Sequence, residues 1–340
     1  MLKQAPRPTL NDVAGHAGVS RATVSLVLRN SPLVAADTRA RVQASAQAVG
    51  YLYNRGAATM RGQRTSTVGL LVTEIDNPFF GELIAGAEVA LDAAGYIAFL
   101  ATTGESVERQ ERTLQRLREH SVDGLILCAA HGTPAERIAR LAQEGPPCVQ
   151  VMRRVRGSTG DFTGPDNRLG LDLLTEHLIA QGHRHIAFAG AAVMHSGIRQ
   201  RLDGVAAALR RHRLPPPLVL RTPATRAGGA EAAGLIQELE TPPTALVCCN
   251  DVVAFGAMPV LERLGLRVGR DIAVTGVGDV PEAAIGYSPL TTLATEPRRI
   301  GQEAVRLLLR RIADPATAAE QVVVPSRLVI RASSAVSPAS

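Results

Sequence analysis

Tryptophan is absent from this chain of 340 residues, and aromatic residues together make up only 3% of it. Hydrophobic residues nevertheless account for 46%, so we expect globular domains with aliphatic cores. The four cysteines form no Cys-x-x-Cys pair and have no histidine at zinc-ligand spacing, which argues against a metal site. Each cysteine lies in or beside an apolar run, so we interpret all four as small core residues.

Long apolar runs are also missing. The first residues, M-L-K-Q-A-P-R-P-T-L, lack the apolar stretch of a signal peptide, and no uncharged run approaches the roughly 18 residues of a membrane-spanning helix. We therefore expect a cytoplasmic protein with no membrane partner. The motifs G-x-S-x-G and H-E-x-x-H and the P-loop are absent too. These absences predict no enzyme, no catalytic residue, no metal and no cofactor.

Positive charge is concentrated at the start of the chain. Residues 1–65 contain nine lysines and arginines but only two acidic residues, for a net charge of +7. The whole chain carries +6, so the remaining 275 residues sum to −1. A basic head on a nearly neutral body is typical of a domain that binds a polyanion. The asymmetry alone is also compatible with a solvated basic segment.

The run T-L-N-D-V-A-G-H-A-G-V-S-R-A-T-V-S-L-V-L, from Thr9 to Leu28, predicts a helix-turn-helix. Thr9 and Asp12 have the spacing of a capping box, Gly18 provides a turn residue that tolerates a positive φ, and Ser20 begins a second helix. In such a motif the second helix places its first side chains in the major groove of DNA. Its outward residues are Arg21, Ala22, Thr23, Ser25 and Leu26.

The rest of the chain has a different pattern of predicted secondary structure. A third helix is predicted from Ala36 to Val49, and residues 51–65 have the basic, glycine-punctuated composition of a linker. From Thr67 onward, short apolar strands alternate with amphipathic helices, which predicts parallel sheets covered on both faces. About ten strand-like runs indicate two α/β lobes. The strands include Val68–Val72, Ile97–Ala101, Gly124–Cys128, Val149–Val151, Ile186–Ala189, Ala245–Cys248 and Ile272–Thr275.

Several ordered motifs make the chain resemble the LacI/GalR family of regulators over nearly its whole length. Besides the helix-turn-helix, these are V-G-L-L-V-x-x-I-x-N-P-F-F at 68–80, V-D-G-L-I-L at 122–127, D-N-R-L-G at 166–170, H-L-I-A-Q-G-H-R-H-I-A-F-A-G at 177–190, C-N-D-V-V-A-F-G-A at 249–257, D-I-A-V-T-G-V-G-D at 271–279 and S-P-L-T-T at 288–292. The resemblance implies a small all-α headpiece and an α/β body of two lobes, like a periplasmic sugar-binding protein. It also implies a transcriptional regulator, most often a repressor, that binds a near-palindromic operator as a homodimer under the control of a small molecule.

For DNA binding, the resemblance implies base contacts from Arg21, Ala22 and Leu26. It also implies a hinge helix over 54–61 that opens the minor groove, with Met60 as the apolar wedge. Leu26 departs from the arginine common at its position, so the operator half-site does not transfer from well-known relatives. The full set of expected DNA-binding residues is Thr9, Ser20, Arg21, Ala22, Thr23, Ser25, Leu26, Asn54, Ala57 and Met60.

For the effector, the resemblance implies a site between the lobes at the carboxyl ends of the strands. Arg201 is expected to pair with ligand oxygens and Phe79 to stack on a ligand ring, while Phe80 is equally compatible with core packing. Asn250 and Asp251 either contact the ligand or cap a helix. The expected effector-binding residues are Asp76, Phe79, Met152, His195, Arg201, Asn250 and Gly278.

Two of these positions depart from the family pattern. Gly278 and Met152 stand where many sugar-binding relatives have aspartates, which removes two carboxylates that would bind sugar hydroxyls. The pocket keeps its arginine, so the departures favour a less polyhydroxylated or an anionic effector. A transport component that only binds a ligand is the alternative, but it would need a signal peptide and no helix-turn-helix.

The expected domains are a headpiece over 1–50, a hinge or linker over 51–65 and an effector-binding and dimerisation body over 66–340. Within the body we expect one lobe from residues 66–164 plus 291–318 and the other from residues 165–290 plus 319–333. The C-terminal ten residues contain no leucine heptads, which disfavours a tetramer formed by the tail.

Overall fold

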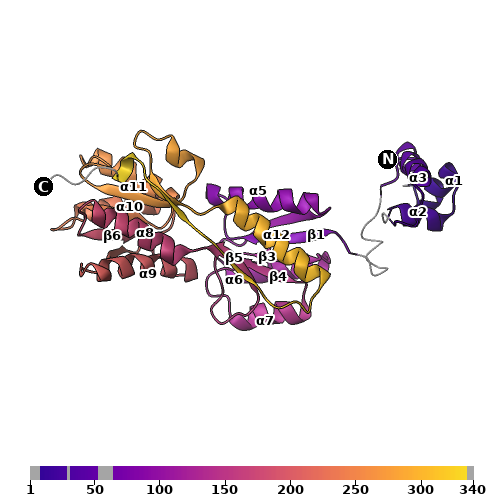
Figure 1. Ribbon diagram of the computed structural model, residues 1–340, viewed down its shortest axis with the longest axis horizontal. Helices are drawn as coiled ribbons and strands as arrows, with labels where there is room; N and C mark the ends of the chain where they lie inside the picture. Colours follow the sequence, from indigo (N-terminus) through magenta and orange to yellow (C-terminus); the bar gives the residue numbers. More distant parts are fainter. Residues whose placement is uncertain (1–7, 29–30, 53–63, 335–340) are drawn as a thin grey trace, which may run out of the picture. The chain divides into compact units, whose positions relative to one another are not determined.

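The computed structural model describes residues 8–28, 31–52 and 64–334. The chain divides into two compact units, Met1–Thr65 and Ser66–Ser340 (Figure 1). The predicted hinge residues Asn54, Ala57 and Met60 lie outside the described residues.

Within its described residues, the first unit has three short helices, α1 (Leu10–Ala17), α2 (Arg21–Leu28) and α3 (Ala36–Ala48). The predicted capping box is present: the backbone N–H of Thr9 donates to Asp12 Oδ2 at 2.7 Å. Gly18 ends α1 with a φ of 62°, and Ser20 Oγ accepts from the N–H of Thr23 at 3.1 Å to cap α2. The helices pack around Val13, Ala17, Val24, Val27, Val42 and Ala46. The predicted helix-turn-helix is therefore confirmed.

The first lobe of the second unit is built on a six-stranded parallel sheet in the order β11-β5-β4-β3-β1-β2. The strands are β1 (Thr67–Val72), β2 (Ile97–Thr102), β3 (Gly124–Leu127), β4 (Cys148–Val151), β5 (Asp161–Pro165) and β11 (Gln321–Val324). Helices α5 (Pro78–Ala93) and α12 (Pro297–Ala313) cover one face, and α6 (Val107–Glu119) and α7 (Ala135–Glu144) cover the other. Such a sheet needs apolar side chains on both faces, which explains why all six residues of β1 are buried.

The second lobe repeats this architecture in the order β12-β10-β9-β8-β6-β7. Its strands are β6 (Ile186–Ala189), β7 (Leu218–Leu220), β8 (Ala245–Cys248), β9 (Ala273–Gly278), β10 (Thr291–Ala294) and the antiparallel edge strand β12 (Arg327–Val329). Two helix pairs pack on it: α8 (Asn167–Ala180) with α9 (Ser196–Arg211), and α10 (Arg226–Gln237) with α11 (Asp251–Arg263). The predicted α/β body of two lobes with parallel sheets is confirmed.

The predicted division of residues between the lobes is wrong at two strands. β10 pairs with β9 in the second sheet, and β11 pairs with β5 in the first sheet. Short apolar strands have no local signal for their partner, whereas in the fold the hydroxyl of Thr292 in β10 donates to Asp251 of the second lobe at 2.5 Å. The chain therefore crosses between lobes three times: after β5, after β10 and after β11.

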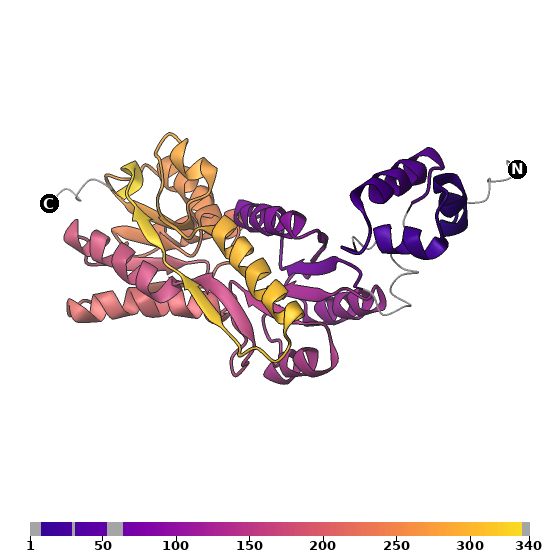
Figure 2. The same cartoon turned by 45° about the vertical axis from the view of Figure 1, so that its right-hand side comes forward.

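Helix α12 follows β10 back to the first lobe, and Figures 1 and 2 both show it beside α5. Two glycines allow this close approach. A Cβ added at Gly301 would lie 2.2 Å from the carbonyl oxygen of Leu83, and one added at Gly86 would lie 2.1 Å from the carbonyl oxygen of Arg298. Among the described residues, none of the helices is long and apolar enough to cross a membrane.

Candidate functional site

The outer surface of α2 carries the side chains that the sequence predicts for reading DNA. Arg21 and Ala22 are exposed, and Thr23, Ser25 and Leu26 are partly exposed. Val24 and Val27, between them, are buried in the headpiece core. This division fixes which face of α2 is available to a ligand. Thr9 and Ser20, at the N-terminal ends of α1 and α2, are also exposed and lie where backbone N–H groups attract phosphate.

A cavity of about 320 Å³ lies between the two lobes of the body. Its walls come from residues that directly follow β1, β4, β6 and β8, so it lies at the carboxyl ends of both sheets. This is where open α/β sheets bind ligands, because the backbone there ends in loops and helix N-termini. We call this space the inner cavity.

Five of the seven residues predicted for effector binding line the inner cavity: Phe79, Met152, His195, Arg201 and Asn250. The other two do not line it. Asp76 is exposed in the loop before α5, and its neighbour Asn77 lines the cavity instead. Gly278 has a φ of 143° and faces the Asp251 carboxylate, 3.0 Å from where its own Cβ would lie, while the preceding Val277 reaches the cavity.

Arg201 is largely buried and makes two neutral contacts. Its Nε donates to Asn167 Oδ1 at 2.8 Å, and a terminal nitrogen donates to the carbonyl oxygen of Cys249. Within the described ranges, no carboxylate lies within ion-pair distance of it. Burial lowers the pKa of Arg201, as expected for a cation removed from water without a carboxylate beside it. A ligand carrying negative charge or several acceptor oxygens would supply the missing compensation.

Arg153 is a second arginine at the cavity, and sequence reasoning missed it. It is 8% exposed and donates to both oxygens of Glu105, at 3.1 and 2.5 Å. Its position directly after β4 was the available signal, because residues at that point face the cleft. Burial raises the pKa of Glu74, a further missed residue of the same wall.

Two non-glycine residues at this wall have left-handed backbone conformations, with a φ of 65° at Met152 and 60° at Glu105. Such conformations cost of order 1 kcal/mol or more and concentrate at binding sites. Here they orient Arg153 and its carboxylate partner toward the interlobe space.

His195 precedes α9 and accepts a hydrogen bond at Nδ1 from the N–H of Ile198 at 3.4 Å. Burial, followed by the nearby charges of Arg153 and Arg201, lowers the pKa of His195 to about 2. The ring is therefore neutral at physiological pH. Because Nδ1 accepts, the proton resides on Nε2, which can donate to a ligand.

The sequence left open whether Asn250 and Asp251 contact the ligand or cap a helix. Asn250 Oδ1 caps α11 by accepting from the N–H of Val253 at 2.8 Å, and the residue also lines the cavity. Asp251 is 1% exposed and accepts from Thr292 Oγ1 at 2.5 Å and from the N–H of Val280 at 3.0 Å. Asp251 thus fixes β10 and the loop after β9 instead of facing the cavity.

Comparisons with known proteins find relatives of both the headpiece and the body. Residues 9–54 match the family described as bacterial regulatory proteins of the lacI family, and residues 175–334 match a periplasmic binding protein-like domain. The chain is 30% identical over 340 residues to the maltose regulon regulatory protein MalI of Escherichia coli, covering 96% of this chain and 99% of that one. It is 33% identical to the HTH-type transcriptional regulator reg1 of Streptomyces lividans, covering 97% of each chain.

Solved structures show the same likeness. A lac repressor dimer bound to operator and the anti-inducer ONPF superimposes with a TM-score of 0.86 at 28% identity, covering 96% of this chain and 99% of that one. A complex of the transcriptional regulator CelR with cellobiose gives a TM-score of 0.71 at 31% identity, with 96% and 100% covered. The similarity extends over the headpiece and both lobes.

Proposed function

The chain belongs to the lacI family of bacterial regulatory proteins, and we propose that this DNA-binding transcriptional regulator is a repressor controlled by a small molecule held between its lobes. It binds a near-palindromic operator as a homodimer and acts in the cytoplasm without catalysing a reaction. The main support for the proposal is that one chain has both an exposed face of α2 that can contact DNA bases and a polar cavity between two α/β lobes.

Within the headpiece, Arg21 is the main candidate for base recognition. It is exposed at the first position of α2, and an arginine there can donate two hydrogen bonds to a guanine. Ala22 and Leu26 offer apolar contacts for a thymine methyl group. Residues 54–61 are proposed to fold on the operator, with Met60 as the minor-groove wedge.

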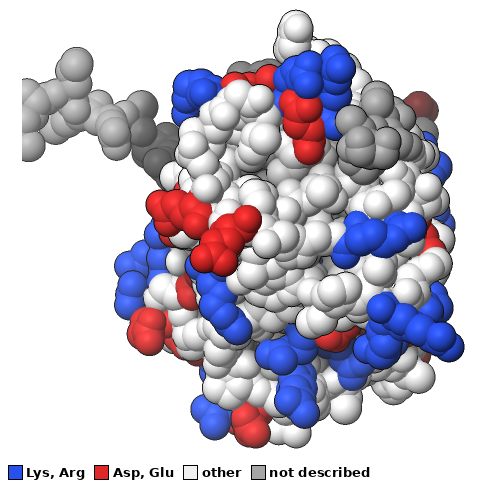
Figure 3. All heavy atoms as spheres, turned by 90° about the vertical axis from the view of Figure 1, so that its left-hand side faces the viewer, with Lys and Arg blue, Asp and Glu red and all other residues white. Residues whose placement is uncertain are grey.

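Exposed apolar side chains on the body support a homodimer. Ile285 and Tyr287 are 80% and 104% exposed beside a largely apolar pocket of about 460 Å³. On β2, the edge strand of the first sheet, Ile97, Phe99 and Leu100 are 57%, 40% and 48% exposed. Figure 3 shows a broad uncharged area on the second lobe, with acidic and basic groups around it. A face without a continuous basic surface suits contact with another protein surface better than with DNA.

Regulation follows from the way the lobes are joined. Three chain crossings connect them, so an effector in the inner cavity contacts both lobes and shifts the equilibrium between their relative positions. We propose that this shift changes the spacing of the paired hinges and thereby the affinity for the operator. A coupling free energy of about 1–3 kcal/mol is sufficient for useful regulation.

In-vitro selection of random duplex DNA at near-physiological salt tests the proposal. We expect a near-palindrome with two half-sites. Arg21→Ala should relax selection at one base pair of each half-site, at a cost of about 1–3 kcal/mol per contact. Arg41→Ala, an exposed arginine on α3, is the matched control for loss of charge and should leave the motif unchanged. Failure to recover any motif, with or without a metabolite extract, would refute the proposed function.

A further inference from the structure

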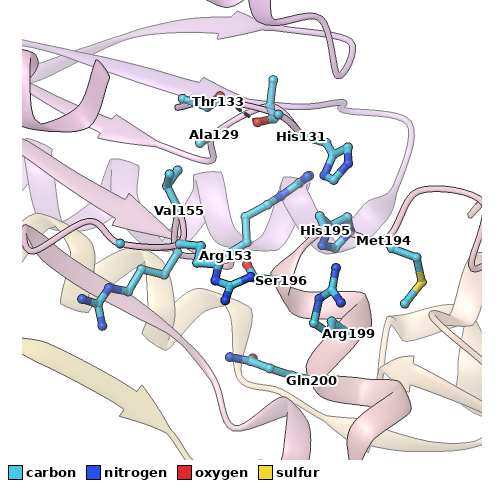
Figure 4. A pocket seen from close by; sticks show the side chains of 15 residues that line it. Ala129, His131, Thr133, Arg153, Val155, Met194, His195, Ser196, Arg199 and Gln200 are labelled. Carbon is cyan, nitrogen blue, oxygen red and sulfur yellow. Dashed lines mark hydrogen bonds between the residues drawn. The ribbon is translucent and has the colours of Figure 1, made fainter. Parts of the chain in front are cut away.

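A second and larger space adjoins the inner cavity. It has a volume of about 730 Å³ and is lined by the loops after β3 and β4 and by the start of α9 (Figure 4). Arg153 and His195 line both spaces, so the two are continuous at these side chains. We call this second space the outer cavity.

The lining of the outer cavity is strongly basic. It contains four arginines and two histidines and no aspartate or glutamate. The arginines are Arg153, Arg154, Arg156 and Arg199, and the histidines are His131 and His195. The inner cavity, by contrast, includes Glu74 and Glu105 in its wall. An anionic group is therefore attracted more strongly to the outer cavity than to the inner one, where Glu74 and Glu105 offset the charges of Arg153 and Arg201.

The four arginines differ in whether other residues of the protein already hold their side chains. Arg154 is held by the carbonyl oxygen of Ser158 and by Gln321, and Arg153 is held by Glu105. Arg156 and Arg199 are exposed, and over the described part of the chain no carboxylate lies within ion-pair distance of either. They are free to bind a ligand without first breaking an ion pair.

The arginines come from opposite lobes. Arg156 follows β4 of the first lobe, and Arg199 lies in the first turn of α9 in the second lobe. Charges of the same sign on facing walls repel each other and oppose closure of the lobes. A dianion between them reverses the sign of that interaction and makes closure favourable.

The start of α9 adds further donors. Ser196 is the first residue of this 16-residue helix and lines the outer cavity, where Figure 4 shows it near His195 and Arg199. A helix N-terminus carries partial positive charge from its unpaired N–H groups. The neutral ring of His195, with its proton on Nε2, adds a donor at the junction of the two cavities.

We propose that the outer cavity binds the phosphate group of a phosphorylated small molecule whose uncharged part occupies the inner cavity beside Phe79 and Arg201. A phosphate fits this site better than a carboxylate or a dicarboxylate because it concentrates its charge and its oxygens on one small group that several guanidinium groups can bind at once. The inference rests on the proposed function, since it names the effector class for the site between the lobes.

Calorimetric titration of the full-length protein with inorganic phosphate tests the proposal, with succinate at equal ionic strength as the carboxylate comparison. We expect phosphate to bind and to raise the melting temperature, and succinate to bind at least tenfold more weakly. The double variant Arg156→Gln, Arg199→Gln should weaken phosphate binding by about tenfold per arginine. The control pair Arg116→Gln, Arg210→Gln changes exposed arginines outside the cavity, on α6 and α9, and should bind phosphate like the wild type.

Three results would overturn the proposal: no phosphate binding by the wild type, equal binding of succinate, or equal losses in both double variants. Operator selection with the wild-type protein separates this failure from failure of the proposed function. If a palindrome is recovered and phosphate does not bind, the effector class is wrong and the regulator stands. If no palindrome is recovered, the regulator itself is wrong, whatever phosphate does.

Discussion

Replacing the buried carboxylate Asp251 with its neutral isostere should change how stability depends on pH. Burial raises the pKa of Asp251 from 3.8 to about 6, even though Thr292 and the N–H of Val280 donate to it. The folded protein therefore holds a proton on Asp251 more tightly than the unfolded chain does. As pH rises through this interval, ionisation costs the folded state about 3 kcal/mol in total.

Asp251→Asn removes this ionisation and keeps the shape. The asparagine oxygen can accept from the N–H of Val280. Its amide nitrogen can donate to the hydroxyl of Thr292, because a hydroxyl can accept a hydrogen bond as well as donate one. We expect the variant to unfold at higher urea concentration than the wild type at pH 7. At pH 4, where the wild-type carboxylate is largely protonated in the folded state but still partly ionised in the unfolded chain, this advantage should shrink by about 2.4 kcal/mol.

Urea titrations followed by far-ultraviolet circular dichroism from pH 4 to 8 measure this difference, and subtracting the two proteins cancels the other titrating groups. Asp251→Ala is the control: it also removes the ionisation but leaves the N–H of Val280 unsatisfied, so it should be less stable than Asp251→Asn by about 1–3 kcal/mol at every pH in that range. A constant difference between the wild type and Asp251→Asn would refute the reasoning, because it would mean that Asp251 has the same pKa in both states.

Three other predictions follow from packing and protonation. Gly301→Ala should destabilise the body by about 1–3 kcal/mol, because its Cβ would meet the Leu83 carbonyl, whereas Gly234→Ala in α10 meets nothing within 4 Å and should stabilise it by about 0.5–1 kcal/mol; thermal melts check both. Val24→Ala should cost the headpiece about 2 kcal/mol and weaken operator binding in gel-shift assays, while phosphate binding by the body is retained. His195→Gln should not change the pH profile of phosphate affinity between pH 5 and 8, since the ring is neutral there; a profile that differs from the wild type near pH 6 would contradict this.

The sequence was sufficient wherever a local pattern determines the structure. The capping box at Thr9, the turn at Gly18 and the alternation of strands and helices all depend on residues close together in the chain, and the structure confirms them. The assignment of β10 and β11 to their lobes failed, because pairing of short strands depends on distant partners such as Asp251.

The same distinction applies to the site. Phe79 was predicted from its position in the motif at 68–80 and Arg201 from its position in R-Q-R-L-D-G at 199–204, and both line the inner cavity. Arg153 and Glu105 are far apart in the chain and become a pair only when the loops after β2 and β4 meet. Asp76 was expected at the effector site but does not line the cavity, for a similar reason: a shift of one residue in a loop decides whether Asp76 or Asn77 faces the cavity.

The three crossings between the lobes also constrain how the chain is completed during synthesis. The first sheet lacks its edge strand until residues 321–324 are made, and the second lacks β12 until residues 327–329 are made. Nascent chains that are shorter than this expose β5 and β10 as unpaired edges, which are templates for aggregation. A premature stop that removes only the last 20 residues would therefore leave both lobes incomplete, although it spares every residue of the headpiece and of both cavities.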